Sequence, residues 1–177
     1  RCGLHKALEV ASGFFAFALY DRQDRVLHLA RDRFGEKPLY YFNKTGRFGF
    51  ASDLRCIKKS RLIDCEIDPS VLSEYMAFGY IHAPNSIYRD VRKVLPGTLL
   101  TFRVADSLVG EPDETKYFTF DKSYRTEIKS ADEALERLDA ALSRAVSMQG
   151  VSDVPMGCYL SGGVDSSLVA YYMQSQS

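Results

Sequence analysis

The sequence lacks both an excess of one charge and any apolar run long enough to cross a membrane. Its 23 basic and 23 acidic residues give a formal net charge of zero over 177 residues. Such a balance carries no electrostatic footprint typical of nucleic-acid or membrane-surface binding. The longest strongly apolar run, residues 14–20, is far shorter than the roughly 20 residues that span a bilayer. We therefore expect neither nucleic acid nor a membrane among its partners.

Metal-binding spacings are also missing. The four cysteines, Cys2, Cys56, Cys65 and Cys158, contain no C-x-x-C pair, and only three histidines are present. No zinc site is therefore predicted. No secretory signal pattern is visible, so reduced thiols in the cytoplasm are expected. The sequence starts at Arg1 rather than at a methionine, and we expect a segment of a longer protein.

What is present is a composition with 46% hydrophobic residues, enough for a globular core. Apolar patterns bounded by turn residues predict a β-rich first part. The predicted strands are residues 13–21, 26–30, 39–42, 48–51 and 98–104. The first of these is apolar without alternation, which predicts a strand covered on both faces.

Helix signals mark three further segments. Residues 52–60 suit a short helix, and Asp68 followed by Pro69 is a typical helix start. Apolar residues then share one face and are predicted to pack in the core: Val71, Leu72, Tyr75 and Met76. A capping box at residues 130–133 opens a long amphipathic helix that ends at Gly150. The polar stretch 121–129 before it indicates a domain boundary, and we predict domains at 1–125 and 126–177.

The most informative motif is a small-residue turn after residue 160. Apolar residues in 154–160 predict a buried strand, in which Cys158 is a small core residue, leading into Ser161-Gly162-Gly163 and then a helix. This arrangement directs backbone N–H groups and a helix N-terminus at one point, which favours an anion. The spacing differs from G-x-x-x-x-G-K-[ST], so the ordinary P-loop is excluded. The motif resembles the Ser-Gly-Gly-x-Asp-Ser pyrophosphate loop of the ATP pyrophosphatases, which adenylate a substrate.

A second motif spans residues 30–41 and reads Ala-Arg-Asp-Arg-Phe-Gly-Glu-Lys-Pro-Leu-Tyr-Tyr. Gly35 permits a tight loop and Pro38 stiffens the entry to a strand. Composition alone also fits an ordinary charged hairpin loop with an internal ion pair. The string, however, resembles the Arg-Asp-x-x-Gly-x-Lys-Pro-Leu-Tyr-Tyr signature of class II (N-terminal-nucleophile) glutamine amidotransferase domains.

Together the motifs resemble glutamine-hydrolysing asparagine synthetase over almost the whole chain. The segments that follow in family order are 13–21, 50–54, 67–69, 75–80, 87–89, 92–93, 96–97, 152–155 and 160–167. The fold that the resemblance implies is α+β followed by α/β. Residues 1–125 would be the C-terminal part of an αββα N-terminal-nucleophile glutaminase sandwich, and residues 126–177 the start of a parallel-sheet ATP-pyrophosphatase domain. Missing partner strands would leave open edges and exposed apolar surface.

The function that the resemblance implies is an ATP-dependent carbon–nitrogen ligase with two sites. One site hydrolyses glutamine to ammonia; the other adenylates the aspartate side chain, and ammonia then displaces AMP to give asparagine. Glutamine, aspartate and ATP would be the substrates, with Mg²⁺ as cofactor, and a homodimer of the whole protein is left open. The implied nucleotide-binding residues are Leu160, through its backbone, and Ser161, Gly162, Gly163, Val164, Asp165 and Ser166. Asp165 would lie near Mg²⁺, although a helix-start Asp is also favoured by the macrodipole alone.

The family's glutaminase nucleophile is a cysteine at the mature N-terminus. Cys2 is not N-terminal, and only eight residues separate Leu4 from Gly13, where the family has several tens of residues with glutamine-binding motifs. We therefore predict that Cys2 is not the nucleophile, that the true nucleophile lies outside this chain, and that residues around Leu4 form the helix before the first strand.

Three readings stay open at this point. The chain is part of an asparagine synthetase, part of a relative that amidates another carboxylate in polysaccharide or antibiotic pathways, or a non-catalytic remnant that acts as a binding module. Phosphoribosyl-transferring amidotransferases share a version of the 30–41 motif, but the Ser-Gly-Gly-Val-Asp-Ser loop argues against them.

Overall fold

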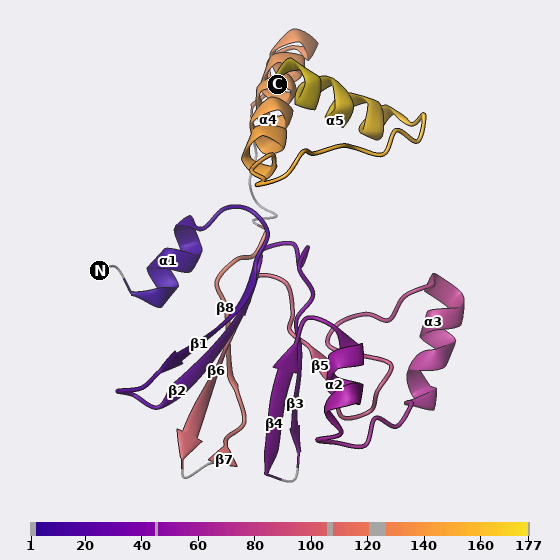
Figure 1. Cartoon of the computed structure of the whole chain (residues 1–177). Coiled ribbons are helices and arrows are strands. Elements are labelled where there is room, and N and C mark those ends of the chain that lie inside the picture. The colour runs from indigo at the N-terminus through magenta and orange to yellow at the C-terminus, as the bar shows by residue number, and fades with distance from the viewer. Residues whose placement is uncertain (1–2, 45, 106–107, 121–126, 177) are drawn as a thin grey trace. The chain divides into compact units, whose positions relative to one another are not determined.

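The computed structural model describes residues 3–44, 46–105, 108–120 and 127–176 (Figure 1). The chain divides into two compact units, Arg1–Phe120 and Asp121–Ser177. The predicted boundary at residue 125 falls in 121–126, outside the described residues, and stays a prediction. Among the described residues no helix has the length and apolar character needed to cross a bilayer.

The first unit is a mixed α and β structure built from two antiparallel sheets. Its elements are α1 (Leu4–Val10), β1 (Ala16–Asp21), β2 (Val26–Arg31), β3 (Tyr40–Lys44), β4 (Arg47–Ala51), α2 (Leu54–Ser60), a 3₁₀ turn (Pro69–Val71), α3 (Leu72–Phe78), β5 (Arg92–Lys93), β6 (Thr98–Ala105), β7 (Leu108–Val109) and β8 (Asp113–Lys116). One sheet has the order β1-β2-β6, with β7 and β8 both paired to β6; the other has the order β4-β3-β5. The predicted strands and the helix at 52–60 are confirmed.

Three groups of buried side chains hold this unit together. The central group, Leu29, Leu39, Val94, Leu100 and Phe102, combines residues from both sheets. A second group places Leu8 of α1 against the first sheet, and a third places Ile57 of α2 against Phe42 of the second sheet. Figure 1 shows α1 beside β1 and β2, and α2 beside β3 and β4. The expected helix at the start of the chain is therefore present and packed.

Two burial predictions in the first unit were wrong. Residues 16–21 form β1, but Leu19 and Tyr20 are nearly half exposed, because β1 is an edge strand that pairs with β2 alone among the described strands. The cap at Asp68 is confirmed, since its side chain accepts a hydrogen bond from Ser70 N. The apolar helix face that follows Asp68 does not pack in the core as predicted. Met76 is 83% exposed, and of the four residues predicted to be buried on this face only Val71 is buried.

The second unit consists of α4 (Ala131–Gln149) and α5 (Val164–Ser175), which lie side by side in Figure 1. The predicted capping box is confirmed in its first half, because Ser130 Oγ accepts from Glu133 N at 3.1 Å. In the second half the Glu133 carboxylate accepts from Lys129 N at 2.9 Å, one residue before the N-cap. The two helices are joined by a hydrogen bond from Tyr172 Oη to Asp139 Oδ1 at 2.7 Å, and this bond raises the pKa of Tyr172. Tyr172 is the one buried residue among those described in this unit.

The predicted strand over 154–160 is not formed. The segment is irregular and its residues are exposed, including Cys158, so the prediction of a buried core cysteine was also wrong. A strand needs neighbouring strands to accept its backbone hydrogen bonds, and the described part of this unit contains helices only. Exposed apolar side chains such as Val151 and Leu160 confirm the expected open apolar surface.

Candidate functional site

The small-residue loop is closed by two serines. Ser166 Oγ donates to Gly163 O at 3.1 Å, and it accepts from Ser161 N at 3.3 Å. Ser166 has one hydroxyl proton, which this bond to Gly163 uses. Ser161 Oγ is therefore the donor in the 2.9 Å contact between the two hydroxyls. The turn is thereby fixed against the first turn of α5.

The N-terminus of α5 meets the loop without a side-chain cap. Gly163 occupies the N-cap position and supplies no side-chain acceptor, so the first-turn N–H groups of the helix are oriented outward without one. Gly162 has φ 81°, and a Cβ built there would meet no heavy atom within 4 Å. Open space, uncapped N–H donors and the positive end of a helix dipole fit a phosphate group. The pyrophosphate part of ATP therefore fits the residues present.

Asp165 lies in the first turn of α5 and is exposed. No group of three or more His, Cys, Asp or Glu residues gathers anywhere in the described part of the chain. One carboxylate is nevertheless a suitable protein contribution to Mg²⁺, because this ion takes most of its ligands from phosphate oxygens and water when it accompanies a nucleotide. The role of Asp165 toward a metal stays a prediction.

The second motif forms a loop that its own charged side chains hold in shape. The Asp32 carboxylate is fully buried and accepts four backbone N–H bonds, from Phe15, Phe34, Glu36 and Lys37. Burial alone would raise the pKa of Asp32, but the four backbone N–H groups outweigh it and lower the pKa. Its charge is therefore stabilised by backbone dipoles.

Arg31 completes the loop by binding three backbone carbonyls. Its guanidinium donates to Lys37 O at 2.8 Å, Val94 O at 2.7 Å and Gly35 O at 2.7 Å. Gly35 has φ 69°, and a Cβ there would lie 2.9 Å from Pro96 Cγ, so glycine is required. Arg31 and Asp32 thus both bind backbone groups, so hydrogen bonds to the chain itself hold this loop in shape.

The structure brings some of the predicted functional residues together and does not describe others. Residues 160–166 gather around the start of α5, whereas Cys2 lies outside the described residues, and the prediction about its role stays a prediction. The backbone-binding roles of Arg31 and Asp32 could not be read from composition. The signal that hints at them is the presence of Gly35 and Pro38 among the residues that follow Arg31 and Asp32.

Comparison with known proteins identifies the class of protein. A family model described as "Glutamine amidotransferase domain" matches residues 1–118, so the chain belongs to the glutamine amidotransferase domain family. A second family model, "Asparagine synthase", matches residues 137–177, which include the loop and α5. The two matches follow each other in the order that the motifs indicate.

Individual relatives narrow the resemblance to one kind of amidotransferase. The chain is 34% identical over 168 residues to "Asparagine synthetase [glutamine-hydrolyzing] 1" of Bacillus subtilis (strain 168), covering 93% of this chain and 26% of that protein. It is 31% identical over 165 residues to "Putative asparagine synthetase [glutamine-hydrolyzing] 2" of Methanocaldococcus jannaschii, covering 92% of the chain and 31% of that protein. The expected resemblance to glutamine-hydrolysing asparagine synthetases is confirmed. The chain spans about a quarter to a third of the length of these relatives.

Proposed function

We propose that the protein containing this chain is a glutamine-dependent asparagine synthetase. ATP adenylates the side-chain carboxylate of aspartate with release of pyrophosphate, and ammonia from glutamine displaces AMP to give asparagine. The observation that carries this proposal is the joining of two features in one chain. A glutamine amidotransferase segment covers residues 1–118, and an uncapped helix N-terminus follows the Ser-Gly-Gly turn in the second unit.

The loop residues are suited to one task, which is to hold the phosphates while pyrophosphate leaves. The backbone N–H groups around Gly162 and Gly163 would donate to phosphate oxygens, and fixed donors of this kind stabilise charge as it develops. The bonds between Ser161 and Ser166 keep the turn in shape before the ligand arrives. Leu160 and Val164 flank the turn and would contact the nucleotide. Asp165 would hold Mg²⁺, which neutralises charge on the departing pyrophosphate when it is bound.

The finer fold assignment is part of this proposal. Packing of α1 on one sheet and α2 on the other, with a shared core between the sheets, supports an αββα glutaminase sandwich for residues 1–125. The irregular segment 154–160 would become the first strand of a parallel sheet once neighbouring strands are present. Its apolar residues support that role.

The identity of the acceptor carboxylate is the part of the proposal that has a specific alternative. The chain is also 31% identical over 173 residues to a protein named "Amidase chyE" of Penicillium rubens, covering 89% of the chain and 23% of that protein. Because this relative is not named an asparagine synthetase, an amidotransferase that acts on another carboxylate is the second candidate. A non-catalytic binding module is the third candidate.

The test is an acceptor panel with the full-length gene product that contains this sequence. We expect formation of AMP and pyrophosphate from ATP with aspartate, and glutamine-dependent formation of asparagine. Glutamate, β-alanine and aryl carboxylates serve as competing acceptors at equal concentration. Turnover with one of these and not with aspartate would favour the second candidate, and no AMP formation with any carboxylate would favour the binding module.

A further inference from the structure

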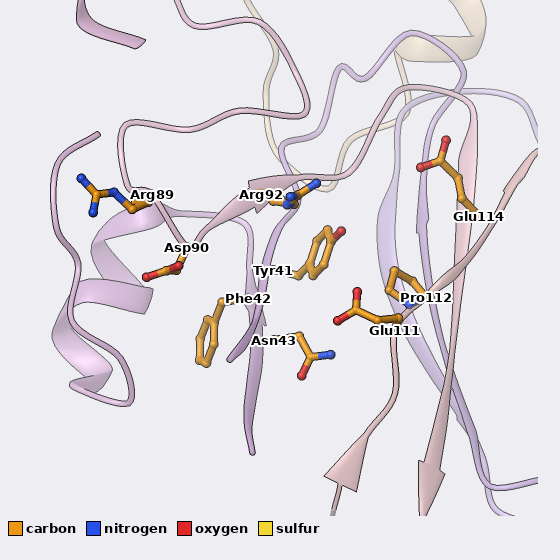
Figure 2. Close-up of a pocket in the computed structure, with 9 residues that line it drawn as sticks. All are labelled: Tyr41, Phe42, Asn43, Arg89, Asp90, Arg92, Glu111, Pro112 and Glu114. Atoms are coloured by element: carbon orange, nitrogen blue, oxygen red, sulfur yellow. The ribbon is translucent and has the colours of Figure 1, made fainter. Parts of the chain in front are cut away.

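The two units contain hollows of different character. In the first unit a polar cavity of ≈ 370 Å³ is lined by residues of β3, β5 and β8 and of the segments before β5 and β8. Figure 2 shows that its charged side chains point in different directions, so they do not converge on one ligand group. In the second unit an apolar groove of ≈ 520 Å³ is lined by α4, by α5 and by residues 156–158. The two helices are therefore incompletely packed against each other where they border this groove.

Two side-chain contacts tie α5 to α4 at the end of α5 that lies away from the nucleotide loop. Tyr172 Oη donates to Asp139 Oδ1 at 2.7 Å. Gln176 Nε2 donates to Ser143 O at 2.9 Å and to Ser143 Oγ at 3.2 Å. Both contacts join residues 33 positions apart, so the second contact lies about one helical turn beyond the first on each helix. Two contacts one turn apart fix the direction of α5 along α4 as well as the distance between the helices.

The opposite end of α5 carries the loop and is exposed. Val164, the first residue of the helix, is 76% exposed. Ser166 Oγ and Ser167 Oγ both donate to Gly163 O, at 3.1 Å and 2.8 Å, so these bonds hold the loop to α5 and not to α4. The direct chain connection between α4 and the loop, residues 151–160, is irregular and exposed. The stiff connection between α4 and the loop is therefore α5 itself.

A stiff helix converts a small rotation at one end into a displacement at the other. Gly163 lies nine positions before Tyr172, which is about 13 Å along the helix axis. A tilt of about 5° at Tyr172 would therefore move the loop by about 1 Å. A displacement of this size weakens hydrogen bonds from fixed backbone donors to a phosphate.

Tyr172 has the properties that a fixed anchor needs. It is 5% exposed, and its ring packs against that of Tyr171 with the ring centroids 5.3 Å apart. The hydrogen bond to Asp139 raises the pKa of Tyr172, so the hydroxyl stays a donor at neutral pH. Removal of the hydroxyl alone would break the contact with α4 and keep the packing of the ring.

We propose that Tyr172 is a positioning residue for the nucleotide loop, and that its hydrogen bond to Asp139 sets the orientation of α5 in which the N–H groups of the loop meet the phosphates of ATP. Tyr172 acts through α5 rather than by contact with the nucleotide. The inference rests on the proposed function for the identity of the ligand. The coupling between Tyr172 and the loop, however, is measurable without ATP.

The test uses Tyr172→Phe in the full-length gene product that contains this sequence. Without ligand, amide hydrogen exchange in residues 161–170 should speed up about fivefold, because one hydrogen bond that holds α5 is lost. In ATP–pyrophosphate exchange the KM for ATP should rise about fivefold and kcat should change less than about twofold, which is the signature of weakened binding. Unchanged amide exchange in the first unit and unchanged glutamine hydrolysis verify that the variant is folded.

Variants at Asp139 separate the hydrogen bond from a general loss of packing. Asp139→Asn keeps an oxygen that accepts from the Tyr172 hydroxyl and should keep wild-type values. Asp139→Ala should reproduce the effect of Tyr172→Phe, and the two changes combined should be no worse than either alone, because both remove the same bond.

The matched control is Tyr171→Phe, which removes the same hydroxyl from the neighbouring residue of α5. Tyr171 is 64% exposed, and this variant should leave both measurements unchanged. Equal effects in the two variants, or unchanged amide exchange in residues 161–170 of Tyr172→Phe, would overturn the proposal. A wild-type enzyme without ATP–pyrophosphate exchange would contradict the proposed function instead, and the hydrogen-exchange result would then decide the coupling alone.

Discussion

The two units of the chain differ in what stabilises them. In the first unit Leu29, Leu99 and Phe102 have no exposed surface, and residues far apart in the sequence supply the contacts. In the second unit α4 and α5 bury Tyr172 and leave residues such as Val151, Leu160 and Val164 exposed. The comparison teaches that a packed sheet core stabilises the first unit, whereas signals within a few residues, such as caps and helix propensity, form the second.

The largest effect that sharpens this comparison is expected at Phe102. Phe102 is fully buried and packs against Tyr41 and Phe48. Phe102→Ala should destabilise the first unit by about 3–5 kcal/mol, because a large buried ring leaves a cavity. Hydrogen exchange read by peptide should speed up in β2, β3 and β6 and stay unchanged in α4. The control is Phe50→Ala, because the Phe50 ring is half exposed. It should lower the free energy of unfolding by less than about 1 kcal/mol. Equal destabilisation in the two variants would contradict the assignment of the core.

An intermediate effect is expected at Asp32, with a defined pH dependence. The lowered pKa of Asp32 means that its stabilising contribution is fully present above the unfolded-state pKa of about 3.9 and is lost as the pH falls through the lower folded-state value. Asp32→Asn should therefore destabilise the first unit by about 2–3 kcal/mol at pH 7. It should also flatten the loss of stability that occurs as the pH falls below the unfolded-state pKa.

Urea unfolding of the chain at a series of pH values measures both effects. Asp24→Asn, at a solvent-exposed turn residue, is the matched control and should change neither the midpoint at pH 7 nor its acid dependence. A wild-type acid dependence in Asp32→Asn would show that the titration of Asp32 is not the source of the loss of stability in acid.

The smallest effect is expected at the start of α4. Ser130 caps this helix through Glu133 N, and Ser130→Ala should cost about 1 kcal/mol. Because the second unit has little packing to compensate, the loss should appear as lower helix content by circular dichroism and faster amide exchange in the first turns of α4. Ser147→Ala, within the same helix, is the control and should leave helix content equal or higher. Unchanged exchange in the Ser130 variant would mean that packing holds α4 in place.

Sequence reasoning succeeded where a local pattern determines the outcome. The strands predicted at 26–30 and 98–104 are rich in apolar residues, and the starts at Asp68 and Ser130 carry cap chemistry, so both kinds of element could be predicted. It missed β8, because Asp113–Lys116 contains only polar residues and forms by backbone pairing with β6. It predicted a strand at 154–160 that is absent, because apolar residues cannot supply their own pairing partners. The loop at 161–166 was visible as a motif, whereas the contacts of Arg31 and Asp32 depend on a backbone path that no local pattern reveals.

The central claim, that the loop before α5 serves ATP-dependent adenylation, is tested most directly by ATP–pyrophosphate exchange in the full-length gene product. Asp165→Asn should lower aspartate-dependent exchange at least about 100-fold and leave glutamine hydrolysis unchanged. The matched control is Asp132→Asn, since Asp132 occupies the first turn of α4 as Asp165 does in α5, and it should keep wild-type exchange. Wild-type exchange in the Asp165 variant would contradict the account.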